Sequence, residues 1–174
     1  MSEGILLPPA PRGALLDEAT RVSRLREAIP QIEAAASGET DAVALQATLA
    51  CLLWETFVQS NWCGFYRRVR PTELAVGPYQ GTMGCLRIDF ARGVCGACAR
   101  TRAVQLVPDV HAFPGHIACD DRTRAELVVP VVAHGELRAV LDLDSPHLAG
   151  FGQAEADLLL PLVQRVFGGA DVVW

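Results

Sequence analysis

The fold of this chain is decided by the stretch Ala125-Glu126-Leu127-Val128-Val129-Pro130-Val131-Val132-Ala133-His134-Gly135-Glu136-Leu137-Arg138-Ala139-Val140-Leu141-Asp142-Leu143-Asp144. Its two apolar runs flank His134-Gly135, a pattern typical of an antiparallel β-hairpin. Successive side chains of a strand point to opposite faces of the sheet. Asp142 and Asp144 are therefore expected on one face, and the two leucines beside them on the other.

The length of the turn decides where Glu126 lies. Gly135 stands where a three-residue loop, Ala133-His134-Gly135, requires a positive φ, and we expect that loop. It places Glu126 directly across from Asp142, whereas a two-residue loop would turn Glu126 to the leucine face. Three carboxylates would then converge, and like charges held close raise the pKa of at least one of them. The pattern is equally compatible with a solvated, exposed acidic face.

Outward from the hairpin, the chain alternates between helical and strand periodicity. The loop 108–123 is long for a compact domain and is expected to be functional. The order predicts an α+β fold with one antiparallel sheet of about six strands and helices packed on one face. A flexible tail over residues 1–13 precedes a single domain over residues 14–174. The expected helices are 14–36 (broken or kinked at Pro30), 41–59, 93–101 and 151–167, and the other expected strands are 61–69, 73–76, 85–90 and 104–107.

The composition narrows the function classes. Hydrophobic residues make up 51% of the 174 residues and charged residues 20%, which excludes a disordered chain. Fifteen basic residues, all arginine, stand against twenty acidic ones, for a net charge of −5. This balance argues against a nucleic-acid or membrane partner. With no recognisable targeting segment or membrane span, we expect a cytoplasmic protein, in which six cysteines serve as core filler, metal ligands or redox groups.

Several cysteines stand out by position. Cys119 lies in the long loop, where a thiol is more reactive than in a core, and His116 is close enough in sequence to stabilise its thiolate. Cys95 and Cys98 form a Cys-x-x-Cys pair, which indicates half a zinc site or a dithiol. A zinc site that also uses Cys85 and Cys119 is an alternative, although the spacing lacks the second close pair typical of structural zinc.

The motifs together resemble the free methionine-(R)-sulfoxide reductases, GAF-domain enzymes that act on the free amino acid rather than on protein-bound residues. The resemblance spans about residues 41–167, and the segment 109–120 is its most specific part. It implies a GAF-like catalytic domain with a substrate pocket under loops, on the sheet face opposite the helices. The motifs that carry it are Asn61-Trp62-Cys63-Gly64-Phe65-Tyr66, Gly77-Pro78-Tyr79-Gln80-Gly81, Gly93-Val94-Cys95-Gly96, Asp109-Val110-His111-Ala112-Phe113-Pro114-Gly115-His116-Ile117-Ala118-Cys119-Asp120, Glu126-Leu127-Val128-Val129-Pro130 and Val140-Leu141-Asp142-Leu143-Asp144-Ser145.

The resemblance also implies roles for single residues. Cys119 would be the nucleophile, Cys85 the main resolving thiol and Cys95 an alternative resolving or assisting thiol. Substrate would be held by the carboxylates, by the aromatic side chains and by backbone N–H groups of the loop around residues 116–119. The residues implied in binding are Glu126, Asp142, Asp144, Trp62, Tyr66, His116 and Ile117.

The resemblance further implies the partners of the reaction. It predicts no metal or organic cofactor, thioredoxin or a similar dithiol as the external reductant, and a homodimer. Cys98 and Cys63 stand where the family usually has small residues without a thiol; Cys98 would either compete for Cys95 or be inert. The alternatives are a non-catalytic GAF sensor of a small ligand or redox state, and a zinc-binding structural protein.

Overall fold

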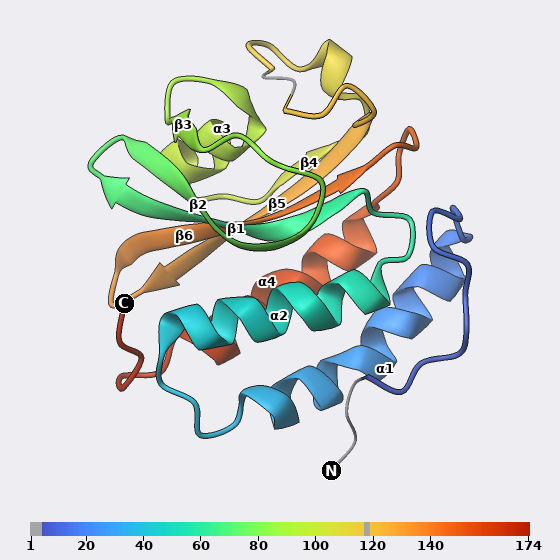
Figure 1. Ribbon diagram of the computed structural model, residues 1–174, viewed down its shortest axis with the longest axis horizontal. Helices are drawn as coiled ribbons and strands as arrows, with labels where there is room; N and C mark the ends of the chain where they lie inside the picture. Colours follow the sequence, from blue (N-terminus) through green and yellow to red (C-terminus); the bar gives the residue numbers. More distant parts are fainter. Residues whose placement is uncertain (1–4, 117–118) are drawn as a thin grey trace.

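The computed structural model describes residues 5–116 and 119–174, and in it the chain forms layers around one curved sheet (Figure 1). The strands are all antiparallel, in the order β3-β2-β1-β6-β5-β4. None of the described helices is long and apolar enough to cross a membrane. The helices are α1 (Glu18–Ala36), α2 (Ala42–Thr56), α3 (Gly93–Thr101) and α4 (Gln153–Phe167), with a short 3-10 turn at Val110–Ala112, and the strands are β1 (Trp62–Arg70), β2 (Glu73–Gly81), β3 (Arg87–Asp89), β4 (Gln105–Val107), β5 (Ala125–Ala133) and β6 (Glu136–Ser145).

The predicted fold class is confirmed, with differences of detail. Helices α2 and α4 cover one face of the sheet and α1 packs on their outer side, while α3 and the loops lie on the other face (Figure 1). Pro30 does not break α1, which continues to its end at Ala36. Strand β2 is longer than predicted and passes through Pro78. A proline is tolerated there because β3 pairs with β2 only at residues 73–75, so that Pro78 lies where β2 is an edge strand.

The hairpin turn differs from the expected one. His134 and Gly135 both have positive φ, 54° and 75°, and form a two-residue turn that pairs Ala133 with Glu136. This is the geometry that best follows the twist of the strands, and it needs the left-handed conformation at both turn positions. The prediction of a three-residue loop was wrong, because Gly135 is the second of two such positions.

A β-bulge restores the face that the shorter turn would have reversed. Arg138 on β6 is an extra residue between Leu137 and Ala139, and the register shifts by one there. Glu126 consequently pairs with Asp144, rather than with Asp142 as predicted, and remains on the acidic face. The bulge therefore keeps Glu126 on the same face of the sheet as Asp142 and Asp144.

The leucine face of the hairpin forms the main core. Leu127, Val129, Leu141 and Leu143 are fully buried against the helices, where α2 contributes side chains such as Leu49. Burial of a side chain of this size stabilises the fold by about 1.5–3 kcal/mol. The helical layer thus holds the sheet from one side and leaves the acidic face toward α3 and the loops.

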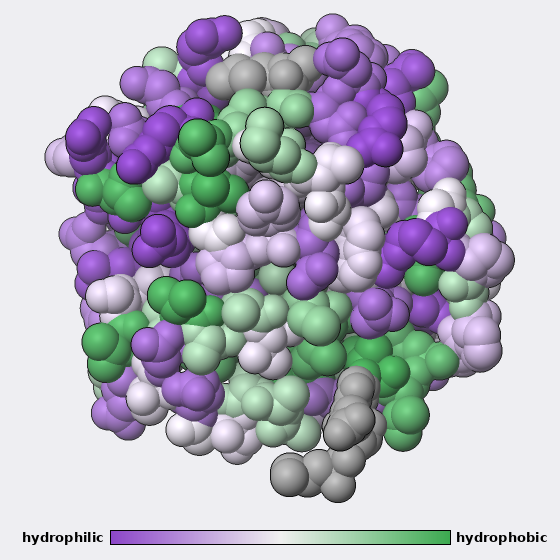
Figure 2. All heavy atoms as spheres, in the orientation of Figure 1, coloured by the Kyte–Doolittle hydropathy of each residue, from purple (hydrophilic) through white to green (hydrophobic). Residues whose placement is uncertain are grey.

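The described part of the N-terminal segment, residues 5–13, packs on the helical layer, and the flexibility expected of it stays a prediction. The Arg12 guanidinium donates to the Trp54 and Phe57 carbonyl oxygens (2.6 and 3.0 Å) and lies 4.0 Å from the centroid of the Trp54 ring. Arg24 of α1 donates to the Pro8 carbonyl at 2.5 Å. Figure 2 shows apolar residues gathered beside this end of the chain, among otherwise interspersed polar ones.

A buried ion pair joins α1 to α4. The Arg21 guanidinium donates to a carboxylate oxygen of Glu155 at 2.6 Å, and the other oxygen of Glu155 accepts from the Gly152 backbone N–H at 2.8 Å. Both side chains are almost completely buried. Removal of one partner would leave the other charge inside the protein without compensation.

We predict that Glu155→Ala lowers the free energy of unfolding by about 3–5 kcal/mol, because it leaves Arg21 charged and unpaired. Arg165→Ala is the control. It removes the half-exposed ion pair that Arg165 of α4 forms with Glu33 of α1, and it should lower the free energy of unfolding by less than about 1 kcal/mol. Urea unfolding followed by circular dichroism measures both. Equal, small losses in the two variants would show that the buried pair is not an anchor.

Candidate active site

The strand register builds the site in one row. Across the neighbouring strands β1, β6 and β5, Trp62 pairs with Asp144 and Asp144 pairs with Glu126. Asp142, two residues earlier on β6, pairs with Gly64 of β1 on the same face. Three adjacent strands thus bring together the three carboxylates and the aromatic residues of β1 that the sequence predicted to bind substrate.

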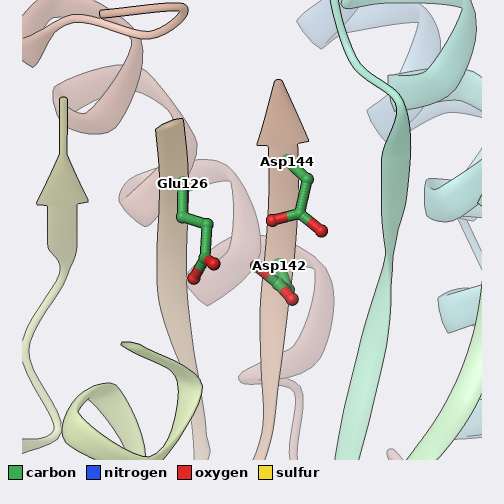
Figure 3. Close-up of side chains that lie close together, drawn as sticks. All are labelled: Glu126, Asp142 and Asp144. Carbon is green, nitrogen blue, oxygen red and sulfur yellow. The ribbon is translucent and has the colours of Figure 1, made fainter. Parts of the chain in front are cut away.

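The three carboxylates form a compact cluster. Glu126, Asp142 and Asp144 each place an oxygen within 4.8 Å of the others, and Figure 3 shows their side chains turned toward one another from β5 and β6. Glu126 is only 8% exposed and Asp142 only 5%, so the alternative of a solvated acidic face does not hold. One oxygen of Asp142 and one of Asp144 are buried without a hydrogen-bond partner among the described residues. Oxygens in this arrangement suit a cation, either a metal ion or a protonated amine.

Burial sets the protonation of the cluster. It raises the pKa of the Asp142 carboxyl to about 7, against the lowering effect of a hydrogen bond from the Cys95 thiol. It also raises the pKa of Glu126 and of Asp144, and the charge of Asp142 raises both further. The cluster therefore holds at least one proton near neutral pH, as the sequence predicted from the convergence of the acids.

An aromatic stack forms the neighbouring wall. The Trp62 ring lies between those of Tyr66 and Tyr79, with centroid distances of 5.3 and 5.2 Å. Tyr79 occupies the space over Gly64, where a Cβ would lie 2.2 Å from the Cβ of Tyr79. The indole N–H of Trp62 is buried and has no partner within the described chain. Trp62 and Tyr66 were predicted for this wall, and Tyr79 was not.

Cys85 and Cys119 are joined by a disulfide, with their Cα atoms 5.4 Å apart. Cys85 lies in the loop between β2 and β3, and Cys119 in the long loop that leads to β5. Both cysteines are partly exposed, and Cys119 lines the same cavity as the acidic cluster. The structure therefore brings together the sulfur atoms that the resemblance named as nucleophile and resolving thiol.

The Cys-x-x-Cys pair of α3 points in two directions. Cys95 faces the cavity and donates its thiol hydrogen to Asp142, and burial raises its pKa well above the ordinary value. Cys98 is fully buried against β5, where its thiol donates to the Val128 carbonyl (3.7 Å). Since Cys98 faces the sheet and Cys85 and Cys119 are bonded to each other, the four-cysteine zinc site is not assembled in this structure.

His116 lies at the edge of the acidic cluster. Its Nδ1 is 3.7 Å from a Glu126 oxygen, which is too long for a hydrogen bond. Burial lowers the pKa of the imidazole, and the neighbouring His111 lowers it further, so the ring is neutral near pH 7. Ile117, the other residue of this loop predicted to bind substrate, lies outside the described residues.

A cavity unites these groups on the sheet face opposite the main helical layer. It is lined by the acids, by Trp62 and Tyr66, by Cys95 and Cys119, and by His116. The lining residues that were not predicted come from the β2–β3 loop, from β3, from the start of α3 and from the long loop before β5. Their contribution depends on how distant segments meet, and no local pattern signals it. These residues are Met83, Gly84, Ile88, Gly93, Val94, Asp120 and Thr123.

Comparisons with known proteins agree with this architecture. The GAF domain family matches residues 32–166. The chain is 40% identical over 130 residues to the free methionine-R-sulfoxide reductase of Escherichia coli, with 75% of this chain and 78% of that protein covered. It is 35% identical over 149 residues to the enzyme of the same name from Saccharomyces cerevisiae, with coverage of 82% and 83%. The X-ray structure of free methionine-R-sulfoxide reductase from Neisseria meningitidis in complex with its substrate aligns with a TM-score of 0.80 and 40% identity, over 90% of this chain and 92% of that one.

Fold and site together define the class: a GAF domain with an acidic cavity that is bordered by a disulfide. Within that class, the chain belongs to the free methionine-R-sulfoxide reductase family. The family predicted from the sequence motifs and the GAF-like fold that they implied are both confirmed.

The raised pKa values make a prediction about stability. A carboxyl whose pKa is raised by folding contributes stability below its unfolded pKa and loses it as pH rises through the folded value. For Asp142 this loss runs from about pH 4, the ordinary range of the carboxyl, to about pH 7, and the raised pKa values of Glu126 and Asp144 add losses that likewise begin near pH 4. Asp144→Asn should therefore raise the melting temperature at pH 8 by about 3 °C or more, and by clearly less at pH 5. Calorimetry of the disulfide form at both pH values measures the change.

The control is Asp157→Asn, at an exposed position of α4, which should shift the melting temperature little at either pH. A shift of equal size at pH 5 and pH 8 for Asp144→Asn would contradict the assigned pKa directions.

Proposed function

We propose that this protein reduces free L-methionine-(R)-sulfoxide to methionine, with Cys119 as the nucleophile. One observation carries the proposal: the Cys85–Cys119 disulfide borders a cavity that contains buried carboxylates with unpaired oxygens. A reactive sulfur, a proton source and a cation-binding cluster are what the reduction of a zwitterionic sulfoxide requires. The names of the relatives supply the substrate class.

The carboxylate cluster binds the ammonium group of the substrate in this proposal. An amine brings its own N–H donors to the unpaired oxygens of Asp142 and Asp144, and its charge offsets theirs. Trp62 and Tyr66 pack on the S-methyl group, and backbone N–H groups of the loop around residues 116–119 bind the substrate carboxylate. A methionine sulfoxide within a peptide has no free ammonium to satisfy the cluster, so the site selects the free amino acid.

The first chemical step transfers oxygen from sulfur to sulfur. The Cys119 thiolate attacks the sulfoxide sulfur, and a protonated carboxyl of the cluster donates its proton to the departing oxygen. The bond between the two sulfur atoms forms as the S–O bond breaks and hydroxide is released. The hydroxide then attacks the Cys119 sulfur, the S–S bond breaks, and methionine leaves. Cys119 ends as a sulfenic acid, oxidised by two electrons, and the sulfoxide has been reduced by two electrons. The raised pKa of Asp142, about 7, makes it a suitable acid at neutral pH.

The second step restores a state that can be recycled. The Cys85 thiol attacks the sulfenic sulfur, an S–S bond forms, and the oxygen leaves as water. A thioredoxin-type dithiol then reduces the disulfide by thiol–disulfide exchange. Cys95 is an alternative resolving or assisting thiol, because it lines the same cavity. The thiols supply all the electrons, so the proposed cycle needs no resident metal or organic cofactor, and it suits a reducing compartment such as the cytoplasm.

A homodimer forms part of the proposal. Its support is the family resemblance, together with exposed apolar side chains on the helical side of the molecule. Among them are Leu15, just before α1, and Val43, in the first turn of α2. Sedimentation velocity at micromolar concentration gives the oligomeric state directly.

We predict that Cys119→Ser loses methionine formation almost completely, by about a thousandfold or more, because the serine hydroxyl is not ionised at neutral pH. Cys85→Ser should release about one methionine per chain and then stop with thioredoxin as reductant, because the sulfenic acid persists. Cys51→Ser is the control, since Cys51 is an exposed thiol of α2 outside the cavity. Chromatography of the methionine released by reduced protein measures all three.

Unchanged turnover in both Cys119→Ser and Cys85→Ser would refute the mechanism. Tight binding of methionine sulfoxide by the unsubstituted protein without any methionine release would instead favour the sensor alternative.

A further inference from the structure

The two cysteine loops are held together by more than the disulfide. Thr82, three residues before Cys85, donates its hydroxyl hydrogen to a carboxylate oxygen of Asp120 at 2.9 Å. Asp120 directly follows Cys119 in the chain. The Arg122 guanidinium spans the same gap, since its Nη2 lies 2.7 Å from Asp120 Oδ2 and 3.3 Å from Thr82 Oγ1. These bonds cross from one loop to the other and involve no atom of the two cysteines.

Asp120 is a fixed anchor rather than a chance surface contact. Its carboxylate accepts from the backbone N–H of Arg122 at 2.9 Å, from the guanidinium Nε of Arg122 at 3.0 Å, and from the Asn61 side-chain amide at 3.2 Å. Its side chain is only 14% exposed. The bonds from Arg122 hold the pKa of this carboxyl well below its usual range, so it is charged throughout the working range of the enzyme.

The same network is tied to the sheet beside the acidic cluster. Asn61 immediately precedes β1 and donates its backbone N–H to the Asp144 carbonyl at 3.0 Å. Its side-chain amide also donates to the Thr123 hydroxyl oxygen at 3.1 Å. The loop of Cys119 is thereby held at the cavity, and Thr82 connects the loop of Cys85 to it.

We propose that Thr82 and Asp120 form a latch that keeps Cys85 within reach of Cys119 after the disulfide has been reduced. The inference rests on the proposed function, in which Cys85 must attack a sulfenic acid on Cys119. That step joins two sulfur atoms and expels the oxygen as water, and its rate depends on the effective concentration of one thiol at the other. Thr82 does not line the cavity and acts through Asp120, so Thr82 is a positioning residue.

The test is a single-turnover experiment on reduced full-length protein mixed with free methionine-(R)-sulfoxide. Thr82→Val removes the hydroxyl with little change of shape, and Thr82→Ser retains it. For Thr82→Val we expect methionine release at the unsubstituted rate, followed by disulfide formation about tenfold slower, as befits loss of one hydrogen bond to a charged group. Thr82→Ser should restore the second rate. Rapid quenching with dimedone, a sulfenic acid trap, separates the two steps.

A second readout uses overoxidation. A longer-lived sulfenic acid is open to further oxidation, so hydrogen peroxide should convert more Cys119 to sulfinic acid in Thr82→Val than in Thr82→Ser. Thr72→Val is the control, because Thr72 is an exposed threonine in the turn between β1 and β2, outside both cysteine loops, and it should behave like the unsubstituted protein. Equal rates of disulfide formation in Thr82→Val and the unsubstituted protein would overturn the latch. Absence of the methionine burst in the unsubstituted protein would instead overturn the proposed function.

Discussion

Three carboxylates share one buried space in this protein, with no arginine paired to them in the described part of the chain, and the rest of the site depends on this constraint. Burial of like charges disfavours their ionisation, and the raised pKa values of Glu126, Asp142 and Asp144 are the direct consequence. A protonated amine in this space would offset the negative charge, which is why we propose the substrate ammonium as its ligand. In the proposed mechanism, the protons that burial retains are those that the departing sulfoxide oxygen needs.

A local irregularity of the backbone makes this cluster possible. The two-residue turn of the β5–β6 hairpin alone would place Glu126 on the helical side, and the bulge at Arg138 returns it to the cavity side. Without this one extra residue, Glu126 would be buried in the leucine core; with it, Glu126 completes the acidic cluster. Because register and chemistry are coupled here, the hairpin cannot slip without loss of both the core and the site.

Much of the fold could be predicted from local patterns, because α2, α4 and the acidic alternation of β6 each carry a clear period. The turn could not, since a glycine after a histidine fits two loop lengths and a bulge leaves no mark in the sequence. Trp62, Tyr66 and the acids were found through the alternation of strands and the resemblance. Tyr79, Thr82 and Asp120 were missed as site residues because their contacts join loops or strands that are distant in sequence.

The most direct measurement of the central claim is incubation of the reduced protein with racemic free methionine sulfoxide and a dithiol, followed by chiral chromatography of what remains. A parallel sample contains N-acetylmethionine sulfoxide, which keeps the sulfoxide but lacks the ammonium group. The account predicts that the R epimer of the free amino acid disappears while its S epimer and the acetylated compound persist. Consumption of the acetylated compound at a similar rate would show that the buried carboxylates do not recognise the ammonium group of the substrate, and would contradict the account.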